Sequence, residues 1–308
     1  MKNKFLSLIV PVYYEQEVLE MSFARMDAAM KDIGYPYEII YVNDGSRDGT
    51  MDKLRQIARD NPHVKVLSFS RNFGHQLAVT AGMDIAKGDA LIIIDVDLQD
   101  PPEVIAEMVK KWEDGGEIVY GKRVKREGET IFKKFTAFCY YRLLSAMSAY
   151  PIPLDTGDFR LIGRKVADVF LSMRERSRFL RGMSAWMGFE TVPVEYVRNE
   201  RAAGKTKYTL KKMLKLAFDG ITGFSSRPLT LAGWLGMFVI ALSMFGLLAL
   251  IILALTVGVR PWLWALDALL LLHGITLVFL GIQGAYMGRM YDELKGRPLY
   301  IVKEKINI

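Results

Sequence analysis

The sequence predicts an α/β fold: a doubly wound, mostly parallel sheet, followed by interfacial amphipathic helices and a hairpin of two transmembrane helices. Strand-like and helix-like segments alternate between residues 6 and 122, which is typical of parallel strands joined by crossover helices. The apolar run Ala90–Ile94 ends abruptly at Asp95 and Asp97, so acids follow a strand that is buried on both faces. Two long apolar stretches fill most of the last third of the chain. Together these observations predict an α/β domain that is attached to a membrane.

The alternating region supplies the predicted elements of the sheet. Strands are expected at Leu6–Val12, Tyr37–Asn43, Val64–Phe69, Ala90–Asp95 and Ile118–Lys122. Helices are expected near Glu15–Ile33, Thr50–Asp60, His75–Ala86 and Pro102–Trp112. None of these strands is followed by a glycine-rich phosphate loop of the GxGxxG or GxxxxGK type. A bound nucleotide would therefore depend on carboxylates and a metal ion.

The acids after the fourth strand form a candidate metal site. Asp95 and Asp97 are two residues apart, so their side chains share one face of an extended segment and repel each other. A hard divalent cation, Mg²⁺ or Mn²⁺, would relieve this repulsion, and Gln99 adds a neutral oxygen. A pair of acids at this spacing is common, and alone it is equally compatible with an acidic loop.

Three other strand ends carry polar clusters, at Pro11–Glu15, Asn43–Thr50 and Ser70–His75. Each cluster alone could be ordinary turn chemistry. Because the carboxyl ends of parallel strands meet at one edge of a sheet, all three are expected near Asp95 and Asp97. This convergence favours a ligand site over an acidic loop.

The middle of the chain contains segments with two interpretations each. Leu154–Leu161 places two acids and an arginine around a glycine, which indicates either a site loop or a turn with a local ion pair. Arg198–Tyr208 is strongly basic, and it is either a solvated loop or a holder of phosphates beside a membrane. Amphipathic helices near residues 130–150 and 208–224 could lie in the headgroup plane, although the first could equally pack in a core.

The last third predicts two membrane spans. Leu231–Val257 has no charged residue and is long enough to cross a bilayer as a helix; Leu263–Met287 is the second apolar span. Basic residues flank the outer ends of the pair, so the positive-inside rule puts both termini in the cytoplasm. The alternative, a buried soluble hairpin, is disfavoured by these lengths. We expect a multi-pass protein of the inner, cytoplasmic membrane. Residues 1–228 would form the cytoplasmic catalytic domain, residues 229–288 would contain the two membrane helices (229–257 and 263–287), and residues 289–308 would form a cytoplasmic tail.

The overall composition agrees with a membrane protein. The net charge is +7 and the mean hydropathy is +0.15, and a chain that is both basic and apolar favours membrane association over nucleic-acid binding. The single cysteine, Cys139, excludes a disulfide within the chain. The apolar run after Lys4 breaks at Pro11 and lacks a cleavage site, so it indicates a strand rather than a signal peptide.

Several motifs resemble those of a known family. They are VPVYYE at Val10–Glu15, VNDGSRDGT at Val42–Thr50, SRNFGH at Ser70–His75, DVDLQDPPE at Asp95–Glu103 and DTGDFR at Asp155–Arg160. In this order they resemble family 2 glycosyltransferases, and the greatest similarity is to bacterial polyprenyl-phosphate glycosyltransferases, relatives of dolichyl-phosphate mannose synthase. The resemblance extends over nearly the whole chain, including the two apolar spans.

The resemblance implies an inverting enzyme of GT-A fold that moves one sugar from a nucleotide diphosphate sugar to undecaprenyl phosphate. UDP-glucose is the first expectation for the donor; UDP-N-acetylglucosamine, other UDP-sugars and GDP-mannose stay open. The residues that match the family's positions are Pro11, Tyr13, Glu15 and Asp44 for the nucleoside, Asp95, Asp97 and Gln99 for the metal and diphosphate, Arg201, Lys205 and Lys207 for phosphates, and Asp158 for the reacting centre. We further expect Arg160 to help bring the lipid phosphate to the sugar. Asp158 could orient the acceptor, orient a sugar hydroxyl, or act as a base.

Two other functions are compatible with parts of the sequence. A processive polysaccharide synthase also joins this catalytic fold to membrane helices, but two spans are few for a polymer channel. A non-catalytic membrane scaffold that senses nucleotides would not need the complete set of acids and basic residues. Small residues in the apolar spans predict packing against other protomers, so we expect a homo-oligomer.

Overall fold

The computed structural model describes residues 4–126, 156–176, 178–198 and 262–308, together with scattered positions between 234 and 256. The chain divides into two compact units. The first contains the sheet described below and also takes in Arg297–Ile308 at the carboxyl terminus. The second contains Lys211–Gly296. The predicted amphipathic helices near 130–150 and 208–224 lie outside the described residues.

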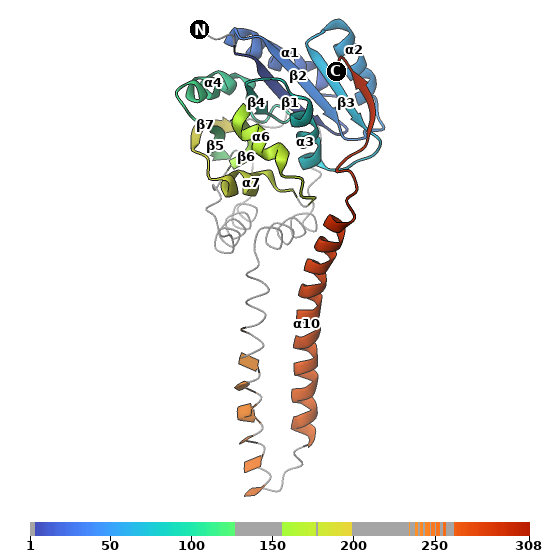
Figure 1. The fold of residues 1–308 in the computed structure, drawn as a ribbon, viewed down its shortest axis with the longest axis vertical. Helices are drawn as coiled ribbons and strands as arrows, with labels where there is room; N and C mark the ends of the chain where they lie inside the picture. Colours follow the sequence, from blue (N-terminus) through green and yellow to red (C-terminus); the bar gives the residue numbers. More distant parts are fainter. Residues whose placement is uncertain are drawn as a thin grey trace. The chain divides into compact units, whose positions relative to one another are not determined.

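In the described part of the chain, eight strands form one sheet with the order β7-β5-β6-β4-β1-β2-β3-β8 (Figure 1). The strands are β1 Leu6–Val12, β2 Tyr37–Asn43, β3 Val64–Phe69, β4 Ala90–Ile93, β5 Ile118–Arg126, β6 Thr156–Gly163, β7 Thr191–Arg198 and β8 Val302–Ile306. The centre, β4-β1-β2-β3, is parallel. Strand β6 pairs antiparallel with β4 and β5, and β8 pairs antiparallel with β3. Strand β7 pairs parallel with β5, so the sheet is mixed and the prediction of a mostly parallel sheet is correct for the centre and for this outer pair.

The described helices are α1 Leu19–Ile33, α2 Thr50–Asp60, α3 His75–Ile85, the 3-10 helix η1 Pro102–Val104, α4 Ile105–Glu113, α6 Arg164–Ser172, α7 Leu180–Met187 and α10 Trp262–Leu294. Two groups of these helices pack beside the sheet. Helix α1 contacts α2 and α4, whereas α3 contacts α6 and the strands β1 and β2. Alternation along β1 explains this arrangement, because Leu8 and Val10 join the core with Met26 and Met30 of α1. The sheet is thus covered by helices, as the doubly wound prediction requires.

The structure confirms most predicted boundaries in the amino-terminal part. Strands β1, β2 and β3 and helix α2 have the predicted bounds. Helix α1 begins at Leu19 instead of Glu15, because Tyr13–Val18 form a bend and a turn first. The predicted helix at Pro102 begins as the 3-10 turn η1 before α4. These differences leave the predicted polar clusters at the strand ends in place.

The prediction of a site loop or turn at Leu154–Leu161 is wrong from Thr156 onward. Residues Thr156–Gly163 form strand β6 between β4 and β5. Hydrogen bonds of the sheet therefore fix Asp158 and Arg160, and Arg160 is in register with Ile93 of β4. Strands β7 and β8 and helices α6 and α7 were not predicted.

The carboxyl terminus returns to the sheet as β8. The Arg55 guanidinium on α2 donates to both carboxylate oxygens of Glu304, at 3.0 and 2.8 Å. The Tyr300 ring stacks on Phe69 of β3, with 5.0 Å between ring centroids. The backbone N–H of Ser70, the residue after β3, donates to the Ile301 carbonyl at 3.0 Å. Residues near the end of the chain thus close the edge of the sheet beside β3.

Helix α10 is a single long helix with apolar side chains around it. Among the described residues, its segment Leu271–Leu294 is long and apolar enough to cross a membrane, by length and composition, and none of it is buried in the structure. It corresponds to the second predicted span. About half of the first predicted span, Leu231–Val257, lies outside the described residues.

Candidate active site

The loop after β2 is fixed by the carboxylate of Asp44. This buried carboxylate accepts hydrogen bonds from the backbone N–H groups of Phe73 at 2.6 Å and Gly74 at 2.9 Å, and from the Asn72 amide at 2.8 Å. Gly45 has φ +71°, and a Cβ there would lie 2.4 Å from the Arg71 backbone, so the close approach of the two loops requires glycine. Asp44 therefore joins the strand ends of β2 and β3.

The end of β1 lies beside this loop. Pro11 is buried within β1 opposite Val42, and Tyr13 follows the strand with 36% of its surface exposed. The backbone N–H of Tyr14 donates to the Ser46 hydroxyl at 3.0 Å, and that of Glu15 donates to the Thr50 hydroxyl at 3.2 Å. The residues predicted to hold a nucleoside, Pro11, Tyr13, Glu15 and Asp44, are thus on two adjacent strand ends.

The predicted metal residues follow β4. Asp97 is buried, and its Oδ1 accepts the Gln99 backbone N–H at 3.2 Å across Leu98, which has φ 57°. The Gln99 Oε1 accepts a hydrogen bond from Arg198 of β7 at 2.7 Å. The oxygen that we expected at the metal is therefore already bonded to a guanidinium, whereas Asp95 and Asp97 keep carboxylates at this edge.

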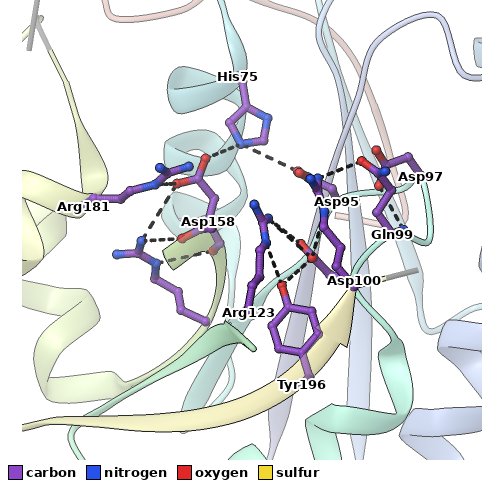
Figure 2. A network of polar contacts seen from close by, with 12 residues as sticks. His75, Asp95, Asp97, Gln99, Asp100, Arg123, Asp158, Arg181 and Tyr196 are labelled. Atoms are coloured by element: carbon purple, nitrogen blue, oxygen red, sulfur yellow. Dashed lines mark hydrogen bonds and ion pairs between the residues drawn. The ribbon is translucent and has the colours of Figure 1, made fainter. Parts of the chain in front are cut away.

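His75, the first residue of α3, lies between two acids (Figure 2). Its Nε2 is 3.3 Å from Asp158 Oδ2 and 3.8 Å from Asp95 Oδ1. Desolvation opposes the charged imidazole, but the carboxylates of Asp95 and Asp158 outweigh it and raise the pKa of His75 to about 9. Desolvation raises the pKa of Asp95 to about 6. The charge of His75 partly offsets this shift and the carboxylate of Asp97 adds to it. The Asp95 side chain is 38% exposed.

Asp158 is held by cations and an amide. Its Oδ1 accepts a hydrogen bond from Arg181 Nε of α7 at 2.9 Å, and its Oδ2 accepts one from Gln76 Nε2 at 3.4 Å. Burial disfavours its ionisation, but Arg181 and then His75 hold the pKa of Asp158 well below its usual range. Asp158 is therefore a carboxylate at neutral pH, and it can accept hydrogen bonds from a ligand.

Arg160 faces the interior of the same region. Its guanidinium donates to the Ser184 hydroxyl at 2.6 Å and to the Gly157 carbonyl at 3.2 Å, and 4% of the residue is exposed. Burial lowers the pKa of Arg160 to about 10. These contacts connect β6 to α7, so the geometry gives Arg160 a positioning role and leaves little of it to meet an acceptor.

A second cluster lies around the buried Asp100 (Figure 2). Its carboxylate accepts hydrogen bonds from the Tyr196 hydroxyl and from Arg123, whose Nη2 lies 3.4 Å from Oδ1. Arg198 Nε is 3.8 Å from the same oxygen. A Cβ on Gly157 would lie 2.4 Å from the Arg123 guanidinium, so glycine lets β6 approach it. Two arginines are thus fixed beside the predicted metal acids.

The donor atoms fit a divalent ion that shares its coordination with a ligand. Within the described ranges, no three His, Cys, Asp or Glu side chains are grouped to hold a metal by themselves. Asp95 and Asp97 supply two carboxylates, and Mg²⁺ is commonly bound by one or two carboxylates together with substrate phosphates and water. The residues present therefore fit a metal that arrives with a diphosphate.

The structure brings together Asp95, Asp97, Gln99, Asp158 and Arg160 as neighbours at one edge of the sheet. Arg201, Lys205 and Lys207 lie outside the described residues, so their roles stay predictions. The prediction missed Gln76, Asp100, Arg123, Arg181 and Tyr196. Asp100 stands within a quoted motif and could have been found there, but α7 and β7 carry no motif that marks Arg181 or Tyr196.

The mixed sheet with a carboxylate edge after β4 has a GT-A-like fold. The crystal structure of glucosyl-3-phosphoglycerate synthase from Mycobacterium tuberculosis, in complex with Mn²⁺, uridine diphosphate and phosphoglyceric acid, matches this fold with a TM-score of 0.51. The sequence identity is 18%, and the match covers 71% of this chain and 76% of that one.

Residues 7–171 match the family model "Glycosyl transferase family 2", and the chain belongs to this family. An uncharacterized glycosyltransferase of Bacillus subtilis, YkcC, is 49% identical over 98% of this chain and 94% of the relative. The SfII prophage-derived bactoprenol glucosyl transferase of Shigella flexneri is 40% identical over 97% of each chain. The resemblance inferred from the motifs is confirmed, and the protein is a glycosyltransferase.

Proposed function

We propose that the protein transfers a single sugar from a nucleotide diphosphate sugar, with UDP-glucose as the first candidate, to a polyprenyl phosphate at the cytoplasmic face of a membrane. The observation that carries this proposal is the position of Asp158 and Asp95 on either side of His75, at the sheet edge where Asp97 follows two residues after Asp95. A relative that is 40% identical over nearly the whole chain is named a bactoprenol glucosyl transferase, which supports the acceptor and the sugar.

The donor side of the reaction uses the strand ends of β1, β2 and β4. Asp95 and Asp97 would hold Mg²⁺ or Mn²⁺ together with the diphosphate, and the loops that Asp44 joins would receive the nucleoside. When bound there, a divalent ion supplies Lewis-acid stabilisation of the leaving diphosphate. Arg198 keeps Gln99 turned toward β7, so Gln99 contributes to the shape of this edge through its bond to the guanidinium.

The acceptor side of the reaction needs little proton transfer. A phosphate monoester is already anionic at neutral pH, because its second pKa is about 6. The main requirements are in-line positioning and stabilisation of charge. Asp158, ionised through Arg181 and His75, would orient a sugar hydroxyl or the acceptor; its lowered pKa makes it a weak base, which disfavours the third expected role, proton acceptance.

The topology of the chain supports two membrane crossings. Strand β7 ends at Arg198 and β8 begins at Val302, and both strands belong to one sheet. If α10 crosses the membrane once, the chain must cross a second time between residues 199 and 261 for β8 to reach that sheet. The second crossing corresponds to the predicted helix at 229–257. With basic flanks at both ends, the sheet and both termini would be cytoplasmic.

The test is a transfer assay with purified protein in detergent, undecaprenyl phosphate, and Mg²⁺ or Mn²⁺. Radiolabelled nucleotide sugars are offered one at a time, with and without EDTA, and label is measured in the organic phase. We expect one donor to give a lipid-linked sugar that EDTA abolishes. Label in a water-soluble polymer would instead establish a processive synthase. Nucleotide binding without labelled lipid from any donor would mean either that undecaprenyl phosphate is the wrong acceptor or that the protein is a sensing scaffold.

The variant Asp97→Ala tests the assignment of Asp97 as a metal ligand. We expect it to lose transfer while keeping the thermal unfolding transition of the wild type, because Asp97 sits at the site edge. Asp32→Ala provides the control, since Asp32 is an exposed acid of α1 that takes no part in the site. Full activity of Asp97→Ala would disprove the metal assignment.

The expected homo-oligomer stays a prediction, which sedimentation of the solubilised protein tests.

A further inference from the structure

Both ends of the Gln76 side-chain amide are bonded to parts of the site. Gln76 is in the first turn of α3, next to His75. Its Oε1 accepts the backbone N–H of Leu180, the first residue of α7, at 2.9 Å. Its Nε2 donates to Asp158 Oδ2 at 3.4 Å. One neutral side chain therefore joins α7 to the carboxylate on β6.

Helix α7 needs such a partner at its amino end. The first N–H groups of any helix have no acceptor within the helix. The residue before α7 is Phe179, and its side chain makes no capping hydrogen bond. Gln76 supplies an acceptor from another element, and Arg160 holds the next turn of α7 through the Ser184 hydroxyl at 2.6 Å. The position of this short helix is thus set by residues of α3 and β6.

The orientation of α7 decides where Arg181 lies. Arg181 directly follows Leu180, and its Nε donates to Asp158 Oδ1 at 2.9 Å. A shift of the first turn of α7 would move this guanidinium away from the carboxylate. An amide is suited to this place because it offers an acceptor for Leu180 and a donor for Asp158 together, whereas a carboxylate lacks the donor and an ammonium lacks the acceptor.

We propose that Gln76 is a positioning residue that fixes the first turn of α7 so that Arg181 is held against Asp158. This inference rests on the proposed function, in which Asp158 acts at the reacting centre. Gln76 itself need not touch either substrate. Its contribution is to keep three elements, α3, β6 and α7, in the arrangement that orients one carboxylate.

Two variants separate the two bonds of Gln76. Gln76→Ala removes both bonds. Gln76→Glu keeps an oxygen for Leu180 but puts a carboxylate in place of the donor to Asp158. Gln56→Ala and Gln56→Glu are the matched controls, because Gln56 is an exposed residue of α2. Hydrogen exchange of the amides in Leu180–Met187 is measured for each protein, together with kcat and with KM for the nucleotide sugar.

We expect Gln76→Ala to speed amide exchange in Leu180–Met187. It should also lower kcat by about tenfold or more, because small misplacements of catalytic groups are costly in rate. KM for the donor should change by less than about threefold. Gln76→Glu should lower kcat while α7 stays protected. Combining Gln76→Ala with Arg181→Gln should cost less than the sum of the two single effects, since both act on Asp158. Such non-additivity is a signature that general loss of stability would not produce.

Three results would overturn the inference: wild-type exchange of α7 in Gln76→Ala, faster exchange in Thr50–Asp60 to the same extent as in α7, or unchanged kcat in both variants. A wild-type protein that transfers no sugar would disprove the proposed function. In that case amide exchange of α7 alone decides whether Gln76 fixes this helix. Failure of one proposal can therefore be distinguished from failure of the other.

Discussion

At the level of single residues, the acids after β4 have different environments. Asp95 is partly exposed at the edge of the sheet and Asp97 is mostly buried, whereas Asp100 points into the protein with 1% of its surface exposed. Asp100 neutralises Arg123 and lies close to Arg198. The motif therefore places two acids at the edge, where we propose that a metal binds, and, a few residues later, an acid that contacts arginines from β5 and β7.

Asp100→Asn tests this separation of roles. Asparagine keeps an oxygen for the Tyr196 hydroxyl but removes the charge between two arginines, so we expect the free energy of unfolding to fall by about 2 kcal/mol. For a domain of roughly 200 residues this corresponds to a Tm that is about 4–8 °C lower. Differential scanning fluorimetry in detergent measures it. Asp52→Asn is the control, because its pair with Arg55 is on the surface and the Asp52 side chain is 80% exposed. Equal Tm values for Asp100→Asn and the wild type would contradict the assignment.

Asp27 gives a prediction about pH. Its carboxylate accepts hydrogen bonds from the Tyr37 hydroxyl at 2.6 Å, from His63 at 2.8 Å and from Lys31 at 2.7 Å. Burial opposes ionisation, but Lys31, Tyr37 and His63 outweigh it and lower the pKa of Asp27. Since the pKa is lower in the folded state, this group stabilises the fold above the unfolded value of about 3.9, and the stabilisation is lost as the pH falls below it.

We therefore expect Asp27→Asn to be less stable than the wild type at pH 6, and the difference in Tm between the two proteins to shrink from pH 6 to pH 3. Thermal unfolding in a pH series measures this difference. A gap that stays constant over the whole series would show that ionisation of Asp27 does not contribute to stability.

At the level of elements, the sequence predicts the strands whose chemistry is simple. Strands β1, β2 and β3 are predominantly apolar segments, and α2 has a regular apolar face, so their bounds could be predicted. Strand β6 was taken for a loop because Gly157, Asp158 and Arg160 are residues typical of turns. Those residues serve the site, and pairing with β4 and β5 overrides their local preference.

Strand β8 was missed for another reason. Its sequence, VKEKI, has three consecutive charged residues between two apolar ones, and a short charged segment after a membrane helix suggests a solvated tail. Charged side chains are common on edge strands because they discourage pairing with another chain. Arg181, the partner of Asp158 on α7, and Tyr196, the partner of Asp100 on β7, were missed because these elements approach the site through tertiary packing, which the motifs of the amino-terminal half do not encode.

Removal of β8 tests the contribution of this element. A chain that ends at Pro298 loses the Arg55–Glu304 pair, the stack of Tyr300 on Phe69 and the pairing of β8 with β3. We expect its Tm to fall by more than about 5 °C, since roughly 1 kcal/mol corresponds to 2–4 °C at this size. Deletion of Ile308 alone, which is half exposed, is the control. A truncated protein with an unchanged Tm would mean that β8 contributes little to the fold.

At the level of the whole molecule, the order of elements along the chain constrains the membrane topology. The catalytic unit contains residues from both sides of α10 in sequence, because β7 precedes this helix and β8 follows it. A single crossing would separate β8 from its sheet. The chain must therefore cross an even number of times if α10 is a membrane span, and this requirement does not depend on the hydropathy of residues 231–257.

Cysteine accessibility tests this topology. In a Cys139→Ser background, which has no other cysteine, a single cysteine is introduced by Trp262→Cys, at the start of α10, or by Ile308→Cys, at the end of the chain. We expect a membrane-impermeant maleimide to label position 262 in right-side-out vesicles and position 308 in inside-out vesicles, because two crossings return β8 to the cytoplasmic side. The Cys139→Ser protein without added cysteine shows the background. Labelling of both positions from the same side would mean that α10 does not cross the bilayer, and label at position 308 in right-side-out vesicles would contradict a cytoplasmic catalytic unit.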